Sequence, residues 1–171
     1  MVNYLLSKYP NHFELSISCT TRPPRGQEVH GKEYYFITPQ EFRQRIQNDE
    51  FIEYEQVYEG LYYGTLKEEI RRIEEAGKQV LFDVDVKGGL NLKRILGEKA
   101  TSVFICPPSI DELRKRLEGR GTDAPEVIDQ RIARAEFELT FADKFDKIVV
   151  NDILEYAEAD ALKVIEDFLN D

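Results

Sequence analysis

The sequence has little of several residue types whose abundance would mark a specialised class of protein. Of its 171 residues, two are Cys, two are His and none is Trp. Two cysteines cannot build the disulfide framework of a small secreted protein, and no Cys or His pair has zinc-ligand spacing. Cys19 and Cys106 each lie in an apolar run that predicts a strand. We therefore expect buried free thiols in a reducing compartment, the cytoplasm.

Positive charge and long apolar runs are also scarce. Lys and Arg number 23 against 33 Asp and Glu, so the net charge is -10. Nucleic acids and anionic membranes bind proteins through excess Lys and Arg, so neither partner is expected. No apolar run of about 18 residues predicts a membrane-spanning helix, and the first eight residues lack the pattern of a signal peptide. An anionic ligand would need a local cluster of arginines.

Strand and helix patterns alternate along the chain, without repeats or a linker, which predicts one α/β domain. Continuously apolar runs separated by helical sequence predict a parallel sheet with helices on both faces. These runs are Val80-Leu81-Phe82, Val103-Phe104-Ile105-Cys106 and Ile148-Val149-Val150. Further strands are expected at residues 13–18, 34–37 and 51–54, and a short amphipathic helix at residues 2–9.

Three capping boxes predict where helices begin. Each pairs Ser or Thr with a Glu three residues later: Thr38 with Glu41, Thr65 with Glu68, and Ser109 with Glu112. Other helices are expected to begin near Pro125 and to include Leu154 and Phe168. Residues 30–65 are expected to form a small lobe inserted into the parallel core.

The most specific stretch holds two arginines, Arg22 and Arg25, beside Pro23 and Pro24. Planar guanidinium groups on a restricted backbone can each engage two phosphate oxygens, which favours a phosphate monoester as ligand. Taken alone, an Arg-x-x-Arg pair is more often an exposed turn with solvated charges.

The residues around this pair resemble the GMP-binding segment of guanylate kinases. Ser-x-Ser-x-Thr-Thr-Arg-x-Pro-Arg at residues 16–25 is followed by Glu-x-x-Gly-x-x-Tyr at residues 28–34. The resemblance continues in order over nearly the whole chain, through residues 51–54, 62–65, 82–88, 107–109, 117–122 and 150–152.

This resemblance implies the fold of a P-loop nucleoside monophosphate kinase, with one guanylate kinase-like domain over residues 1–171. Within it we expect a GMP-binding lobe at about 30–65 and a helical lid at about 110–135. The implied reaction is phosphoryl transfer from ATP to GMP in purine nucleotide metabolism, with Mg²⁺ bound with ATP and without a direct set of protein ligands. The alternative is a guanylate kinase-like scaffold that has lost catalysis.

By position, the resemblance implies residues for the two ends of GMP. The phosphate would be held by Arg22, Arg25, Tyr34 and Tyr63, and the guanine by Ser18, Glu53 and Thr65. The chemistry agrees, because the Glu53 carboxylate can accept both the N1–H and the N2–H₂ of guanine, whereas adenine has an acceptor at N1. In isolation, Glu53 would be an ordinary surface glutamate and Thr65 a helix N-cap.

The predicted catalytic residues are Arg22, Asp83, Asp85, Arg120 and Arg131. Asp83 and Asp85 follow a strand, where a carboxylate can orient magnesium-bound water or a phosphate-binding arginine, or simply cap a turn. These roles are not divided between them, and Asp83 is also placed in the GMP site.

Arginines in the expected lid would close over the phosphates of ATP during transfer. Arg120 and Arg131 match the family positions for this role, and Asn151 matches a position near the adenine, although it could also be a strand-end turn residue. Arg114, Arg116 and Arg134 are expected to form a solvated helix face.

The family's phosphate-binding loop has no convincing match. Residues 26–32 have the Gly-x₄-Gly-Lys spacing, but Glu33 follows in place of Ser or Thr and no helix pattern comes next. The resemblance places the first strand and the loop upstream of Met1, through a misassigned start, a truncated gene or a loopless variant. We therefore expect the chain as written to bind GMP, to transfer phosphate very slowly, and to be less stable than a longer form.

Overall fold

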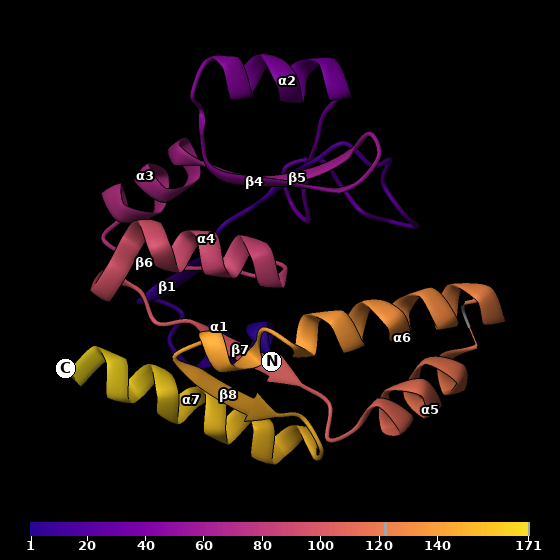
Figure 1. Ribbon diagram of the computed structural model, residues 1–171. Coiled ribbons are helices and arrows are strands. Elements are labelled where there is room, and N and C mark those ends of the chain that lie inside the picture. Colours follow the sequence, from indigo (N-terminus) through magenta and orange to yellow (C-terminus); the bar gives the residue numbers. More distant parts are fainter. Residues whose placement is uncertain (122, 171) are drawn as a thin grey trace. The chain divides into compact units, whose positions relative to one another are not determined.

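The computed structural model describes residues 1–121 and 123–170. The chain divides into two compact units, each of which is described by itself (Figure 1). One unit contains Leu6–Leu96 with Val2, and the other contains Gly97–Asp171 with Met1 and Asn3–Leu5. The chain begins with helix α1, Val2–Lys8, as the apolar spacing predicts.

The Leu6–Leu96 unit contains a pair of parallel strands. Strand β1 (Phe13–Leu15) pairs with β6 (Gln79–Leu81), and the amide of Ser16 extends the ladder by donating to the carbonyl of Leu81 at 2.9 Å. The strand expected over residues 13–18 therefore ends at Leu15. The chain then crosses to a second sheet, where it resumes as β2 (Cys19–Thr20).

The second sheet has four strands in the order β3-β2-β5-β4. Strands β3 (Tyr35–Phe36), β4 (Phe51–Tyr58) and β5 (Leu61–Leu66) join β2, with β4 antiparallel to β5 and β2 parallel to β3. In Figure 1, helix α2 (Pro39–Gln47) lies on one side of β4 and β5, and helix α4 (Val86–Leu96) lies on the other. The capping box of Thr38 and Glu41 is confirmed at the start of α2.

The hydrophobic core of this lobe lies between the sheet and α2. Cys19, Phe42, Phe51 and Leu66 form a buried cluster, and the rings of Phe42 and Phe51 stack with their centroids 4.4 Å apart. Alternation along the strands sends the intervening side chains to the opposite face of the sheet. The lobe therefore has one apolar face under α2 and one face that is free to hold polar groups.

A register shift between Phe51 and Glu53 places these two residues on different faces. Phe51 pairs with Leu66 and Glu53 pairs with Thr65, so Ile52 is an extra residue in β4. Such bulges re-aim side chains next to functional sites. Gly64 allows β5 to approach at this point, because a Cβ atom there would lie 2.9 Å from the side chains of both Phe51 and Tyr54.

Helix α3 (Lys67–Glu75) follows β5 directly. Its N-cap residue is Leu66, which makes no side-chain cap, so the capping box predicted for Thr65 and Glu68 is wrong. The Thr65 hydroxyl donates to the Glu53 carboxylate because Thr65 remains in β5 and faces β4.

The Gly97–Asp171 unit contains a second pair of parallel strands, β7 (Val103–Cys106) and β8 (Lys147–Val150). Its helices include α5 (Ile110–Arg120), α6 (Pro125–Leu139) and α7 (Leu154–Asn170), with short 3₁₀ turns at Gly97–Lys99 and Ala142–Lys144. Ser109 caps α5 as predicted, since its hydroxyl accepts from the amide of Glu112.

Side chains on β7 and β8 alternate between packed and exposed positions. Phe104, Cys106 and Val149 are buried, whereas Ile105 and Ile148 are exposed. Both cysteines of the chain are buried free thiols, as predicted. Among the described residues, no helix is long and apolar enough to cross a membrane.

Candidate functional site

A buried carboxylate lies on the polar face of the four-stranded sheet. Glu53 is 8% exposed and Thr65 is fully buried. The Thr65 hydroxyl donates to Glu53 Oε1 at 2.8 Å, and this leaves Oε2 for another donor. The pair comes from adjacent strands, and the register shift in β4 aligns it.

Asp85 lies beside this pair. The Gly88 amide donates to Asp85 Oδ1 at 2.8 Å, at the start of α4. A Cβ atom on Gly88 would lie 3.2 Å from Glu53 Oε2 and 3.3 Å from Asp85 Oδ1, so a side chain at this position would crowd both carboxylates. Burial raises the pKa of Glu53; the Thr65 hydrogen bond opposes this shift and the charge of Asp85 adds to it.

A cationic and aromatic cluster surrounds Arg22. Its guanidinium carbon lies 4.8 Å from the Tyr34 ring centroid and 5.4 Å from that of Phe36. The rings of Tyr34 and Tyr63 are in edge contact at 5.9 Å. The structure thus brings together three of the residues predicted to bind phosphate, and Phe36 joins them because it shares a strand face with Tyr34.

Glu28 holds the Arg22 guanidinium through two hydrogen bonds. Arg22 donates from its two terminal nitrogens to the two Glu28 oxygens at 2.6 and 2.7 Å, and the Arg25 amide donates to Glu28 as well. The hydrogen bonds from Arg22 and from the Arg25 backbone lower the pKa of Glu28 to about 2. The motif contained Glu28, but sequence reasoning gave it no role.

Asp83 and Asp85 lie in different surroundings. Burial raises the pKa of the Tyr34 phenol, and the nearby charges of Tyr63 and Asp83 add to the effect. Asp83 therefore lies near the Arg22 cluster, whereas Asp85 lies beside Glu53. Asp83 is exposed just beyond the end of β6.

Ser18 and Arg25 are linked to the Arg22 cluster through backbone groups. The Ser18 carbonyl accepts the Tyr35 amide at 2.9 Å, which fixes its backbone between β1 and β2. Arg25 is exposed. Residues 26–32 form turns that lead to β3, in keeping with their rejection as a phosphate-binding loop.

The other predicted residues, Arg120, Arg131 and Asn151, belong to the Gly97–Asp171 unit. Arg120 is the last residue of α5, and Gly121 ends that helix in the left-handed conformation at φ 62°. Arg131 Nε lies 3.2 Å from the Asp123 carboxylate. Thr122, part of the lid motif, lies outside the described residues.

Arg116 differs from the expectation of a solvated helix face. It donates to the backbone carbonyls of Asn151 and Asp152 at 2.7 and 2.9 Å, and so it holds the segment that follows β8. Carbonyl groups beyond a strand end need donors, and a long side chain on α5 supplies them. The Asn151 amide donates to the Cys106 carbonyl at 2.7 Å.

The fold is that of an α/β protein of the nucleoside monophosphate kinase class. The sequence model of one family, described as guanylate kinase, matches residues 1–170. The chain belongs to the guanylate kinase family.

Similar proteins span most of the chain. A guanylate kinase of Bacteroides thetaiotaomicron is 59% identical over 170 residues, covering 99% of this chain and 83% of that relative. A guanylate kinase of Bacteroides fragilis is 60% identical over 169 residues, covering 99% and 82%. The crystal structure of guanylate kinase from Anaplasma phagocytophilum has a TM-score of 0.77 at 27% identity, covering 96% of this chain and 80% of that chain.

The buried charge of Glu53 predicts that Glu53→Gln stabilises the ligand-free protein at neutral pH. Because the folded pKa is raised, stability falls as pH rises from the ordinary glutamate pKa through the folded one, and the penalty is complete above it. Glutamine keeps an acceptor for Thr65 and removes the charge. We expect a gain on the order of 1 kcal/mol at pH 7, from urea unfolding.

The gain should shrink as pH falls toward about 4, where Glu53 becomes protonated in both states. Glu74→Gln, at an exposed position on α3, is the control and should change little. A Glu53→Gln protein less stable than the parent at pH 7 would contradict the cost assigned to this carboxylate.

Proposed function

We propose that this chain binds GMP and transfers a phosphoryl group to it from ATP, giving GDP and ADP. The carrying observation is that one sheet face presents the buried Glu53 carboxylate and the Arg22–Tyr34–Tyr63 cluster, which are complementary to guanine and to a phosphate monoester. Family membership supports the same reaction. The buried thiols of Cys19 and Cys106 suit the reducing cytoplasm, where we place this purine nucleotide chemistry.

Guanine recognition would centre on Glu53. Its Oε1 already accepts from Thr65, which leaves Oε2 to face the N1–H and N2–H₂ donors of the base. Asp85 lies next to Oε2 and extends the acceptor surface. Adenine would set an acceptor against these oxygens, and Ser18 would complete the guanine contacts. GMP would be preferred over AMP because adenine would leave the buried Glu53 carboxylate without hydrogen-bond donors.

Phosphate binding would centre on Arg22, with Arg25, Tyr34 and Tyr63 as further donors. The Glu28 carboxylate now occupies both terminal nitrogens of Arg22. A phosphate monoester also presents two acceptor oxygens that a guanidinium can bind together, so it would replace Glu28 at these nitrogens. Asp83, near Tyr34, would orient the arginine or the accepting phosphate.

Transfer of the phosphoryl group needs positive charge and the exclusion of water. Arg120 and Arg131 would supply charge to the phosphates of ATP, and Asn151 would lie at the adenine. Arg131 is held by Asp123, whereas Arg120 has no hydrogen-bonding or charged partner among residues 1–121 and 123–170. Arg120 is therefore available to bind an anionic ligand.

The residues present fit a magnesium ion carried by ATP. No group of three or more acidic, His or Cys side chains in the described parts of the chain could hold a metal by itself. Mg²⁺ commonly retains water and uses one or two carboxylates with substrate phosphates. Asp83 is exposed and could orient such water, and the bound ion would neutralise charge on the donor phosphates.

The first functional prediction is selective binding of GMP over AMP, measured by calorimetry. Glu53→Gln should weaken GMP binding by about 10- to 100-fold, because hydrogen bonds to a buried charge are worth roughly 1.5–3 kcal/mol. The same change should affect AMP little. Equal affinity of the parent for both nucleotides, or unchanged GMP preference in Glu53→Gln, would refute the assignment.

The second prediction separates phosphate from base. Arg22→Met should reduce GMP affinity by at least about tenfold and leave guanosine affinity within about twofold, since one charge-assisted contact is lost. Glu28→Gln should bind GMP more tightly than the parent, because the competing carboxylate is removed. Arg43→Met, at an exposed position on α2, controls for general electrostatics. If Arg22→Met weakened the binding of guanosine as much as that of GMP, Arg22 would not be a phosphate contact.

The third prediction concerns turnover, followed by coupled detection of ADP release. Release should be slow, because no segment of the sequence matches the family's phosphate-binding loop, and it should require GMP, ATP and Mg²⁺ together. Arg120→Met and Arg131→Met should each reduce it by about 10²- to 10³-fold without changing GMP affinity. Arg114→Met is the matched control, since Arg114 lies on α5 and pairs with Asp129 at 2.8 Å. ADP release that is independent of GMP, or equal loss in all three variants, would count against the proposed roles.

A further inference from the structure

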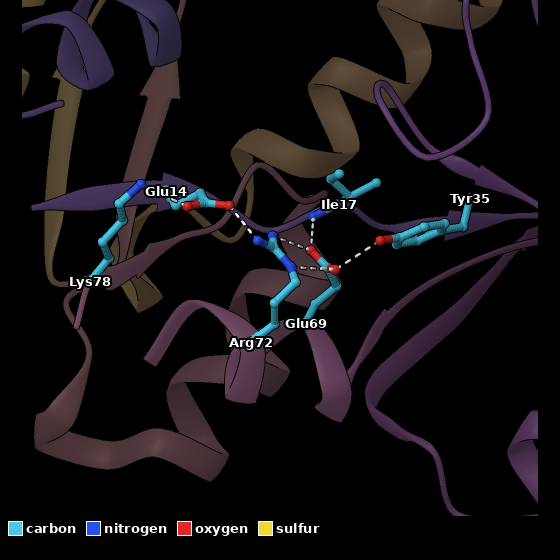
Figure 2. Close-up of polar contacts among 6 residues, drawn as sticks. All are labelled: Glu14, Ile17, Tyr35, Glu69, Arg72 and Lys78. Carbon is cyan, nitrogen blue, oxygen red and sulfur yellow. Dashed lines mark hydrogen bonds and ion pairs between the residues drawn. The ribbon is translucent and has the colours of Figure 1, made fainter. Parts of the chain in front are cut away.

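Glu69 is a buried carboxylate on the reverse side of the lobe from Glu53. Its side chain is 4% exposed, on the first turn of α3. Figure 2 shows donors from three segments around it. The Ile17 amide donates to Oε2 at 3.0 Å, the Tyr35 hydroxyl donates to Oε1 at 2.9 Å, and Arg72 donates to both oxygens at 3.1 Å.

Ile17 lies where the chain crosses from one sheet to the other. The Ser16 amide belongs to the β1–β6 ladder, and the Ser18 carbonyl belongs to the β2–β3 pairing. The amide between them is part of neither ladder. Glu69 supplies its acceptor, and an amide buried without one would cost free energy. The carboxylate therefore fixes the crossing point of the chain.

The partners of Glu69 are direct neighbours of the predicted GMP contacts. Ile17 precedes Ser18, and Tyr35 follows Tyr34. Successive side chains of a strand point to opposite faces, so the Tyr35 ring packs against the core under α2 while Tyr34 lies at the Arg22 cluster. One carboxylate on the reverse face thus holds two segments that carry ligand contacts on the front face.

The same network ties these segments to the parallel strand pair. Arg72 also pairs with Glu14 of β1, and Lys78, just before β6, donates to the other Glu14 oxygen at 2.8 Å. Figure 2 shows this continuous path from Lys78 through Glu14 and Arg72 to Glu69. Movement of the Ser18 segment relative to β1 would break several of these contacts at once.

The pKa shifts of Glu69 and Tyr35 favour the charge states that these hydrogen bonds require. Burial raises the pKa of Glu69, but hydrogen bonds from Arg72, Ile17 and Tyr35 outweigh it, so the net pKa is below the ordinary value. Burial, together with the bond to Glu69, raises the pKa of the Tyr35 phenol to about 12, so it remains a donor at neutral pH.

We propose that Glu69 is a positioning residue for the GMP site, holding the Ser18 and Tyr34 segments in their binding geometry from the reverse face of the sheet. This inference rests on the proposed function, because it concerns the same nucleotide site. A purely structural glutamate would change stability alone. A positioning residue would change nucleotide affinity in protein that remains folded.

The test compares three variants by calorimetry with GMP, well below their melting temperatures. Glu69→Gln removes the charge that pairs with Arg72 and one acceptor oxygen, and should weaken GMP binding about tenfold. Tyr35→Phe keeps the packed ring and removes one hydrogen bond, so a loss of about threefold is expected. Glu68→Gln also removes an acidic charge from the first turn of α3 but is exposed, and should stay within twofold.

Amide hydrogen exchange at Ile17 provides a second readout that does not depend on ligand. It should be faster by at least tenfold in Glu69→Gln and unchanged in Glu68→Gln. If Glu69→Gln does not fold, the GMP affinity of Tyr35→Phe tests the positioning role in its place. Folded Glu69→Gln and Tyr35→Phe proteins that bind GMP within twofold of the parent would overturn the inference.

Failure of the proposed function gives a different result. In that case the parent itself would not bind GMP in preference to AMP, whatever residue occupies position 69. Positioning would then be decided by exchange at the Tyr35 amide, which donates to the Ser18 carbonyl and not to Glu69. Unchanged exchange there in Glu69→Gln would overturn it, and faster exchange would support it for a site with another ligand.

Discussion

The extra residue in β4 is the constraint on which the lobe depends. Ile52 shifts the register so that Phe51 enters the core under α2 while Glu53, two residues later, faces the opposite way beside Thr65. In a regular strand these two residues would share a face, and either the core or the site would lose its side chain. One inserted residue therefore allows the same short strand to serve both faces of the sheet.

Charge is arranged very differently at the two ends of the site. The Arg22 guanidinium already has a carboxylate partner in Glu28, so its charge is neutralised without ligand. The Glu53 carboxylate is buried with a hydroxyl donor and beside a second acid, and it has no positively charged partner among residues 1–121 and 123–170. A ligand that offers donors to Glu53 and a phosphate that replaces Glu28 at Arg22 would match both groups. This match is local, because the overall field of a protein with a net charge of -10 repels anions.

The two buried glutamates show how one short segment serves both faces. Thr65 lies near the end of β5, on the polar face of the sheet. Glu69, four positions later, lies in the first turn of α3 and is buried. The change from strand to helix rotates the side-chain directions, so that the first residue faces Glu53 and the second faces Ile17 and Tyr35. The stability of the reverse face and the geometry of the front face are thus linked through a continuous piece of backbone.

Features that depend on neighbouring residues could be predicted from the amino-acid sequence. These include the capping box at Thr38, the apolar strand runs, the buried free thiols and the motifs that contain Arg22 and Glu53. It did not show that Thr65 stays in a strand, that the strand from Phe13 breaks at Ser16, or that Asp83 and Asp85 have different surroundings. Glu69 stands beside the exposed Glu68 in a charged helix, and its pattern gives no sign of burial. These points required the folded structure, because the partners of Glu69 lie 52 and 34 residues away and local periodicity cannot encode contacts at that separation.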